Sequence, residues 1–410
     1  MEQGQHNLVV VGGGHAGAQL CSALVAAGQG ARVHLVCEEA DLPYQRPPLS
    51  KSFMKDPGEA VQLHRADAWY AEAGITRHMG DSAVYIDRQA HQVTLRSGTK
   101  IDYAKLVLAT GTRARQLPQL PQLPQKPLDN VALLRTADDG RRLREKLAGT
   151  RRLTILGGGF IGLEIAATAR ASGIDVTVLE TAPRLLGRSV SPELAAHVLQ
   201  GHRGAGIDIR LGVTINDFEV EGGRLLSLSV NGQPEPVELL VLGIGAVPEQ
   251  QLAAAAGLVC DNGIKVDELM RTSDPDILAI GDCASFLEVS TGRQLRLESV
   301  QNANDQARTA AATLMGREEP YVSLPWFWSE QGDMRLQMAG LLPAAGERYV
   351  RPSAKPNSFS ILHYAGDRLV CVESCNAPVD HMAARKLLEA GTSPEPRLTV
   401  DPATPLKAFL

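Results

Sequence analysis

The chain carries one pattern twice, and this repeat constrains the fold more than any other feature. The pattern reads LVVVGGGHAG at residues 8–17 and LTILGGGFIG at residues 153–162. Each copy is an apolar segment typical of a buried strand, then G-x-G-x-x-G, then an alanine-rich segment typical of a helix. A second apolar segment ending in an acid follows each copy, VHLVCEE at 33–39 and VTVLE at 176–180. The repeat therefore predicts two βαβ units that bind dinucleotides.

A single G-x-G-x-x-G is a weak signal, because a glycine-rich turn is often only a turn. Here both copies have a strand, a helix and an acid at suitable spacing, about 145 residues apart. The first glycine permits a tight turn, the second lets a pyrophosphate approach the backbone, and the third lets helix and strand pack closely. The free N–H groups at the helix N-terminus then face the phosphates.

The segments around the repeat predict the domain organisation. A strand entering a glycine turn, KLVLATGTRAR, occupies 105–115, and the proline-rich stretch 117–127 is expected to be an extended connector. From Pro325 the sequence alternates like a meander of strands and closes with a helical segment at 381–391. We expect an α/β protein with two Rossmann-like domains and a small α+β domain. Two dinucleotide units imply two dinucleotides, and the economical pairing is FAD in one and a nicotinamide dinucleotide in the other. The expected boundaries are 1–113 with 244–322 for the FAD-binding domain, 114–243 for the NADH-binding domain, and 323–410 for the C-terminal domain.

Composition narrows the function classes. The 410 residues are 44% hydrophobic and 21% charged, which is ordinary for a soluble protein. The net charge of −5 argues against general nucleic-acid binding. We find no transmembrane segment and no signal peptide, so a cytoplasmic location is expected. No pair of the six cysteines has C-x-x-C spacing and no zinc spacing occurs, so reduced thiols and no metal site are expected.

The acids after the second strands should bind ribose. Glu38 and Glu39 are both candidates in the first unit; we favour Glu38, with Glu39 solvated. Glu180 is the candidate in the second unit, and a carboxylate there favours NADH over NADPH because it repels a 2′-phosphate. Arg184 and Arg188 follow, either as pyrophosphate contacts, less readily as 2′-phosphate contacts, or as a solvated basic loop.

Several motifs together resemble the FAD-dependent pyridine-nucleotide reductases with a glutathione reductase-like fold. Within them the chain is similar to the ferredoxin reductases that serve bacterial oxygenases, with rubredoxin reductases close by. The resemblance covers essentially the whole chain. The motifs that carry it include LPYQRPPLSK, LVLATGTRAR, LGIGAVP, ILAIGDCA, LESVQNANDQA and PWFWSEQGDMRLQMAGL.

The resemblance implies a set of cofactor-binding residues. For FAD it implies Gly12, Gly14, His15, Ala16, Gly17, Glu38, Arg46, Lys51, Ala83, Thr110, Gly111, Arg135, Asp282, Glu298, Val300 and Trp328. For NADH it implies Gly157, Gly159, Phe160, Ile161, Gly162, Glu180 and Gly245, to which we add Arg184 and Arg188. His15 occupies a turn position where a small residue is frequent.

The resemblance also implies the catalytic residues. Lys51 is expected beside the flavin ring, Glu164 at the meeting place of flavin and nicotinamide, and Trp328 over the flavin. We hypothesise that Lys51 and Glu164, from different domains, form a buried ion pair, since each alone would be costly to desolvate. The alternative for Lys51 is a surface lysine that extends to solvent.

The favoured function is NADH-dependent reduction of FAD, followed by single-electron transfer to a small acidic iron–sulfur protein. That partner would be a [2Fe–2S] ferredoxin, or alternatively rubredoxin, and would supply a cytochrome P450 or a Rieske oxygenase. A disulfide reductase or NADH oxidase would need a redox cysteine near Tyr44–Lys51, where none occurs. A third alternative is a nucleotide-sensing protein resembling apoptosis-inducing factor. A monomer or weak homodimer is expected, without nucleic-acid or membrane partners. Arg308, Arg335 and Lys386 are candidates for contacting the acidic partner, or are ordinary surface charges.

Overall fold

The computed structural model describes residues 7–117, 128–289, 291–353 and 355–410. The chain divides into two compact units, which we describe separately. Unit 1 consists of Met1–Arg46, Ala60–Arg113 and Ala246–Ser323, and unit 2 consists of Pro47–Glu59, Ala114–Gly245 and Leu324–Leu410. The proline-rich connector expected at 117–127 lies, apart from Leu117, outside the described residues.

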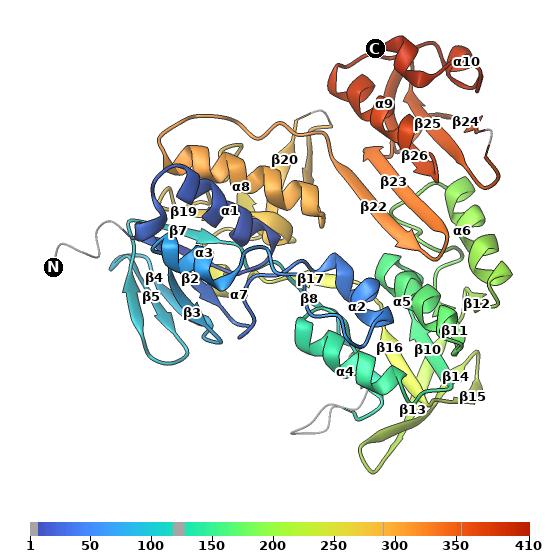
Figure 1. Cartoon of the computed structure of the whole chain (residues 1–410), viewed down its shortest axis with the longest axis horizontal. Coiled ribbons are helices and arrows are strands. Elements are labelled where there is room, and N and C mark those ends of the chain that lie inside the picture. Colours follow the sequence, from blue (N-terminus) through green and yellow to red (C-terminus); the bar gives the residue numbers. More distant parts are fainter. Residues whose placement is uncertain (1–6, 118–127, 290, 354) are drawn as a thin grey trace. The chain divides into compact units, whose positions relative to one another are not determined.

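Unit 1 is built on a five-stranded parallel sheet in the order β19-β7-β1-β2-β3 (Figure 1). Every residue of β1 is buried, as expected for a parallel strand covered on both faces. Helices α1 and α8 pack against each other. The elements are β1 (Leu8–Val11), α1 (His15–Ala26), η2 (Gly30–Arg32), β2 (Val33–Cys37), α3 (Asp67–Glu72), β3 (Thr76–Met79), β4 (Ala83–Asp87), β5 (Gln92–Leu95), β6 (Lys100–Asp102), β7 (Lys105–Leu108), β8 (Thr112–Ala114), β17 (Ala246–Pro248), α7 (Gln251–Ala255), β18 (Ile264–Val266), β19 (Ile277–Ala279), η4 (Gly281–Cys283), β20 (Ala284–Glu288), β21 (Arg293–Leu295) and α8 (Val300–Leu314).

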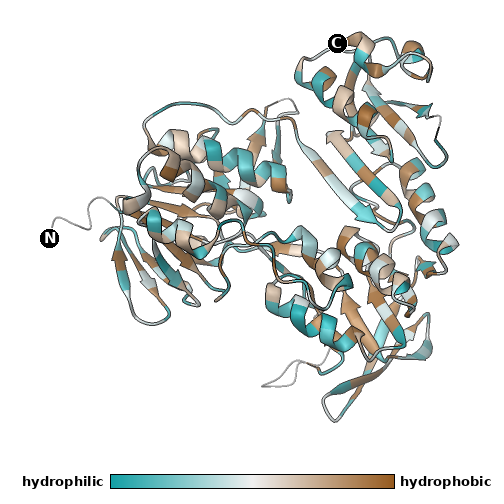
Figure 2. Ribbon diagram, viewed as in Figure 1, coloured by the Kyte–Doolittle hydropathy of each residue, from teal (hydrophilic) through white to brown (hydrophobic). Residues whose placement is uncertain are grey.

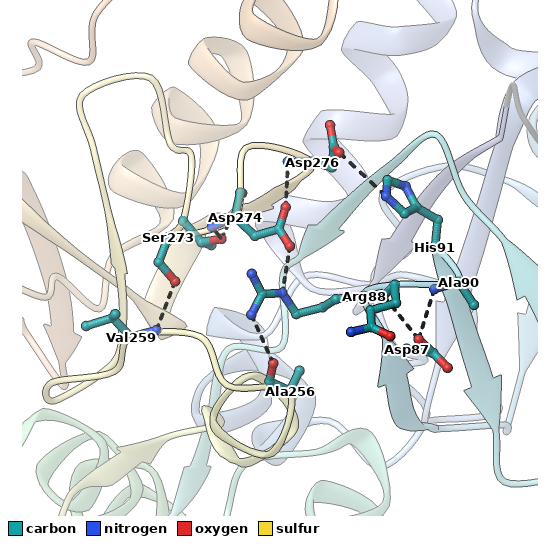
Figure 3. Close-up of polar contacts among 11 residues, drawn as sticks. Asp87, Arg88, Ala90, His91, Ala256, Val259, Ser273, Asp274 and Asp276 are labelled. Atoms are coloured by element: carbon teal, nitrogen blue, oxygen red, sulfur yellow. Dashed lines mark hydrogen bonds and ion pairs between the residues drawn. The ribbon is translucent and has the colours of Figure 1, made fainter.

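Polar contacts fasten the distant segments of unit 1 together (Figure 3). Arg88, in the turn between β4 and β5, donates to Asp274 at 2.6 Å and to the carbonyl of Ala256 at 3.4 Å. His91 lies 3.7 Å from Asp276, and the backbone N–H of Asp276 donates to Asp274 at 3.0 Å. Residues more than 150 positions apart in the sequence therefore belong to one discontinuous unit.

Unit 2 contains a second five-stranded parallel sheet, in the order β12-β11-β10-β16-β9. Helix α4 begins with a capping box in which Thr136 and Asp139 exchange hydrogen bonds, and Figure 2 shows it largely hydrophilic. The elements up to residue 245 are η3 (Pro47–Ser50), α2 (Ser52–Lys55), β9 (Val131–Ala132), α4 (Ala137–Leu147), β10 (Arg152–Leu156), α5 (Phe160–Ala171), β11 (Asp175–Glu180), α6 (Pro192–Gly204), β12 (Asp208–Leu211), β13 (Ile215–Glu221), β14 (Arg224–Val230), β15 (Gln233–Pro236) and β16 (Leu239–Leu242).

The C-terminal part of unit 2 is an antiparallel sheet in the order β22-β23-β26-β25-β24, against which α9 packs. Buried Leu336 and Ile361 of this sheet belong to the same hydrophobic cluster as Ile155 and Leu163 of the βαβ unit, so the two parts of unit 2 share a core. The elements are β22 (Trp326–Gln331), β23 (Met334–Gly340), β24 (Glu347–Pro352), β25 (Phe359–Ala365), β26 (Arg368–Cys375), α9 (Pro378–Glu389), α10 (Pro396–Thr399) and η5 (Leu406–Phe409).

The predicted fold class is confirmed: two Rossmann-like parts and a small α+β part are present. The expected domain boundaries stay a prediction. The division into two units groups the expected NADH-binding and C-terminal domains together in unit 2. It also assigns residues 47–59 to unit 2, although the sequence predicts them in the FAD-binding domain. The contacts of η3 and α2 with α4 and α5 explain this placement.

Candidate functional site

The first glycine turn lies in unit 1, between β1 and α1. Gly12 has φ +115°, and a Cβ there would collide with the carbonyl oxygen of Ala109. A Cβ on Gly17 would collide with the carbonyl oxygen of Gly12. A Cβ on Gly14, by contrast, would meet nothing within 4 Å. The outer glycines are thus required by packing, while the middle one faces open space at the N-cap of α1, which fits the approach of a pyrophosphate.

The second glycine turn, in unit 2, has the same construction. Gly157 has φ +109°, and a Cβ there would collide with the carbonyl oxygen of Gly243. A Cβ on Gly162 would lie 2.5 Å from the carbonyl oxygen of Gly157, whereas one on Gly159 would lie no closer than 3.8 Å to its nearest neighbour. Phe160 begins α5 and packs against Phe327 at 4.7 Å between ring centroids. Both turns fit a dinucleotide.

The predicted cofactor residues gather at the carboxyl edges of the two parallel sheets. In unit 1, Thr110 and Gly111 follow β7, and Asp282 follows β19, both strands being on the same side of β1 in the sheet. In unit 2, Gly245 follows β16, which pairs with β10. This edge, where parallel strands end, is where open α/β sheets bind ligands.

The other predicted residues are placed as follows. Ala83 begins β4, and Val300 begins α8. Glu298 forms an ion pair with Arg296 at 2.6 Å. The backbone N–H of Arg135 donates to Asp139 ahead of α4, and Arg135 belongs to unit 2, whereas the predicted FAD pyrophosphate turn belongs to unit 1. His15 and Ala16 open α1, and the His15 ring contacts that of His64 edge-on at 4.6 Å.

Glu180 has both carboxylate oxygens engaged by its own βαβ unit. The backbone N–H of Gly158 donates to one at 2.6 Å and that of Ala182 to the other at 2.7 Å. These bonds fix the carboxylate beside the glycine turn. Arg184 binds the carbonyls of Gly187 and Val190, so its guanidinium stabilises its own loop. Arg188 is exposed.

The expectation that Glu39 is solvated is wrong. Its carboxylate accepts from Arg46 at 2.7 Å and from the Tyr44 hydroxyl at 2.6 Å. Glu38, the favoured ribose ligand, has a side chain 75% exposed and lies 3.6 Å from Arg96. Sequence reasoning overlooked Tyr44 because its role depends on the folded path between Glu39 and Arg46.

Lys51 and Glu164 form the expected ion pair, with Nζ 2.7 Å from Oε2. Glu164 is 2% exposed, and Lys51 is half-buried with 19% of its side chain exposed. Both belong to unit 2, so the expectation that they come from different domains differs from the observed packing. Trp328 lies on β22, also in unit 2, with its ring centroid 5.6 Å from that of Trp326.

Two serines that the sequence did not single out complete the surroundings of Glu164. The Ser50 hydroxyl donates to Oε2 at 2.5 Å, and the Ser329 hydroxyl donates to Oε1 at 2.7 Å. The buried carboxylate therefore accepts bonds from three side chains. Ser50 adjoins Lys51 and Ser329 adjoins Trp328 in the sequence, which is the only signal that could have indicated them.

All six cysteines are free thiols, as expected. Burial raises the pKa of Cys21 and Cys37 to about 12 and that of Cys375 to about 11. Burial also raises the pKa of Cys260, Cys283 and Cys371. Thiolates, the reactive form in redox catalysis, are disfavoured at each position.

Among the described residues, no three His, Cys, Asp or Glu side chains are grouped so as to hold a metal ion. No helix in the described part of the chain has the length and apolar character needed to cross a membrane.

Comparisons with known proteins agree with this architecture. A family model described as pyridine nucleotide-disulphide oxidoreductase matches residues 6–307, and one described as reductase C-terminal matches residues 326–410. Rhodocoxin reductase of Rhodococcus erythropolis is 42% identical over 96% of this chain and 92% of its own length. The ferredoxin–NAD(+) reductase component of the anthranilate 1,2-dioxygenase system of Burkholderia cepacia is 38% identical over 98% of both chains. The reductase in the crystal structure of the covalent putidaredoxin reductase–putidaredoxin complex superposes with a TM-score of 0.93, at 38% identity over 98% of both chains.

Proposed function

Because the chain belongs to the pyridine nucleotide-disulphide oxidoreductase family, we propose that it is an NADH-dependent ferredoxin reductase. Its partner is a small acidic [2Fe–2S] protein that delivers electrons to a bacterial oxygenase of the P450 or Rieske type. The observation that carries this proposal is the presence of two glycine turns in one chain, each with a middle glycine that faces open space. We call the turns at Gly12–Gly17 and Gly157–Gly162 the dinucleotide cradles. Two cradles suit an enzyme that passes electrons from one dinucleotide to another.

The dinucleotides are FAD in unit 1 and NADH in unit 2. The turn at Gly12–Gly17 holds the FAD pyrophosphate, and the turn at Gly157–Gly162 holds that of NADH. FAD supplies the conversion of a two-electron hydride into two single electrons, which an iron–sulfur partner needs. The chain's own contribution is to bind both dinucleotides and to orient the nicotinamide through Glu164 and Lys51. Glu180 selects NADH, because its fixed carboxylate repels a 2′-phosphate.

The cysteines favour this reading over a disulfide reductase or thiol-dependent NADH oxidase. Those enzymes need a thiolate of lowered pKa beside the flavin. Every thiol of this chain has a raised pKa, and none lies between Tyr44 and Lys51. No specific observation favours a nucleotide-sensing function of the kind seen in apoptosis-inducing factor.

The electron acceptor and its docking surface are the finer part of the proposal. The relatives include a ferredoxin–NAD(+) reductase component of a dioxygenase system and a reductase in covalent complex with putidaredoxin. Arg308, Arg335 and Lys386 are the candidate cations for an acidic partner. Arg308 already pairs with Asp305, and Arg335 lies 4.0 Å from Glu330, so both are partly compensated. We place the enzyme in the cytoplasm.

The test is steady-state electron transfer by the FAD-loaded full chain. NADH and cytochrome c are supplied with or without a purified [2Fe–2S] ferredoxin, and in parallel with a rubredoxin. We expect fast cytochrome c reduction only when the ferredoxin is present, with a rate that falls as salt screens the acidic partner. If cytochrome c is reduced rapidly with the rubredoxin and not with the ferredoxin, rubredoxin replaces ferredoxin as the proposed acceptor.

A disulfide panel provides the control. We expect no NADH consumption with low-molecular-weight disulfides, because no described thiol favours the thiolate form. Rapid disulfide reduction, or failure of NADH to reduce the bound flavin, would contradict the proposed function.

A further inference from the structure

The hydrogen bonds around Glu164 continue beyond its nearest partners into a buried chain. Ser329 Oγ donates to Glu164 Oε1 at 2.7 Å, and Gln331 Nε2 donates to Ser329 Oγ at 3.1 Å. Gln331 Oε1 lies 2.8 Å from Nε2 of His202. We call His202, Gln331, Ser329 and Glu164 the Glu164 chain. It joins α6, β22 and α5, all within unit 2.

The four side chains of the Glu164 chain are all shielded from solvent. The exposed fractions are 2% for His202, 1% for Gln331, 0% for Ser329 and 2% for Glu164. Ser329 and Gln331 are two residues apart on one strand and therefore share a face of the sheet. Buried polar groups are costly to leave without partners, so each member of the chain restricts the orientation of the next.

The donors all point toward the carboxylate. A serine hydroxyl has one proton, and Ser329 gives it to Glu164 while accepting from the Gln331 amide. With its amide nitrogen so used, Gln331 presents its oxygen to His202, which must then carry its proton on Nε2. Burial lowers the pKa of His202, so the neutral ring is the form present at pH 7. Hydrogen bonds aligned in this way polarise and strengthen one another.

The target of the chain is one carboxylate oxygen on the helix that starts at the second glycine turn. Glu164 lies two residues after Gly162 on α5. Lys51 and Ser50 bind the other oxygen, Oε2. Ser329, at the end of the Glu164 chain, binds the remaining oxygen, Oε1. The rotation of the carboxylate is thereby fixed relative to the turn that holds NADH.

We propose that Ser329, Gln331 and His202 are positioning residues that fix Glu164 and, through it, the nicotinamide of NADH for hydride transfer. The inference rests on the proposed function. The three residues contact neither dinucleotide in this role; they act through the Glu164 carboxylate. The hydride, one proton with two electrons, passes from NADH to FAD as in the proposed function. The Glu164 chain neither gains nor loses a proton.

The experiment measures flavin reduction in the FAD-loaded full chain by stopped flow, as a function of NADH concentration. For Ser329→Ala we expect the limiting rate constant to fall about tenfold or more, the loss expected from misplaced reacting atoms, while the Kd for NADH changes less than about threefold. Ser329→Thr, which keeps the hydroxyl, should restore most of the rate. The primary isotope effect with NADH deuterated at C4 should rise in Ser329→Ala as hydride transfer becomes rate-limiting.

A matched control separates positioning from stability. Ser374 is 1% exposed on β26 of the same sheet, and its hydroxyl bonds Ser360 at 2.9 Å. Ser374→Ala should leave the limiting rate constant within about twofold of wild type. Equal slowing by Ser329→Ala and Ser374→Ala would overturn the proposal.

A double-mutant cycle tests whether Ser329 acts through Glu164. In a Glu164→Ala background, Ser329→Ala should have no further effect on the limiting rate constant. The far end of the chain gives a second test if Ser329→Ala does not fold. His202→Gln, which keeps a donor near Nε2, should be faster than His202→Phe, which removes it.

Two readouts distinguish failure of this inference from failure of the proposed function. Calorimetric titration of the oxidised, FAD-loaded variants with NAD+ should show binding close to wild type. If wild type is reduced by NADH while Ser329→Ala and His202→Phe match it, the inference fails and the function stands. If wild type is not reduced by NADH, the proposed function fails, and the inference with it.

Discussion

Helices α1 and α5 begin at equivalent glycine turns, yet they carry different groups two residues after the last glycine. On α1 this residue is Gln19, which is partly exposed, and on α5 it is Glu164, which is 2% exposed. The carboxylate requires Ser50, Lys51 and Ser329, all contributed by segments outside its βαβ unit. The repeat thus builds the same glycine turn twice, and at this position the second helix carries a buried carboxylate where the first carries a partly exposed amide.

The acids of the two units also differ. Pairing places Val33 opposite Leu8 and Val176 opposite Leu153, so the residue equivalent to Glu180 is Cys37. Cys37 is buried, and Glu38 and Glu39 lie beyond it. In unit 2 the acid bonds the glycine turn itself, whereas in unit 1 Glu39 bonds Arg46. Similar motifs therefore hold their carboxylates in different ways.

The largest effect should come from breaking the shared cradle. Gly17→Ala forces a Cβ against a backbone carbonyl, which should lower the free energy of unfolding by about 3 kcal/mol and abolish FAD retention. Gly14→Ala, whose Cβ meets open space, should keep the fold and lose FAD affinity. Thermal unfolding and the FAD content of purified protein measure both. Equal melting temperatures for the two variants would show that the outer glycine is not required by packing.

The next effect concerns Glu164, the buried acid that follows the second glycine turn. Lys51→Met removes the cation from Glu164, and we expect flavin reduction by NADH to slow about tenfold to a hundredfold. The free energy of unfolding should fall by only about 1–2 kcal/mol, since Lys51 is partly hydrated and Ser50 and Ser329 still donate. Stopped-flow reduction and urea denaturation give the two quantities.

The matched change in unit 1 is Arg46→Met, which removes the cation from Glu39. It should weaken FAD retention and leave the limiting rate of flavin reduction in the loaded enzyme nearly unchanged. If NADH reduces the flavin of Lys51→Met as fast as that of wild type, the Lys51–Glu164 and Arg46–Glu39 pairs do not differ in function.

A smaller effect should follow from altering the acid of the second unit. Glu180→Ala removes the acceptor of the Gly158 and Ala182 N–H groups and the repulsion toward a 2′-phosphate. The kcat/KM for NADH should fall about tenfold, because one hydrogen bond to a charged group is lost. The ratio of kcat/KM for NADH to that for NADPH should also fall. Cys37→Ala, at the equivalent position of unit 1, should leave both values unchanged.

The smallest effect concerns two histidines, the partly exposed His64 in unit 1 and the buried His381 in unit 2. Burial lowers the pKa of His64 and of His381 to about 4. Between pH 6.5 and 4 the unfolded chain binds a proton at each position that the folded chain does not, so stability falls as the pH falls below 6.5. His381→Phe, which keeps a ring against Trp326, should reduce the loss in melting temperature between pH 7 and pH 5 by a few degrees. If the melting temperature of His381→Phe falls between pH 7 and pH 5 by as much as that of wild type, His381 does not contribute to the pH dependence of stability.

The features predicted correctly depend on neighbours in the sequence. The glycine turns, the parallel sheets, the strands after Pro325 and the free thiols all follow from short patterns. The helix expected at 381–391 is α9, but it begins at Pro378, because proline suits a first helical turn, and it ends at Glu389. The Lys51–Glu164 contact was also expected, from family resemblance rather than from spacing. The family itself is confirmed by its matching model.

What the sequence by itself determined is the pair of dinucleotide cradles, because a tight turn, a close backbone approach and a helix N-terminus are local properties of a few glycines. Only the tertiary structure decided which side chains surround them. Glu39 bonds Arg46 instead of water, residues 47–59 pack within unit 2, and Ser329, Gln331 and His202 meet Glu164. Each of these contacts forms because a buried polar group needs a hydrogen-bond partner. No local sequence pattern indicates which partner that will be.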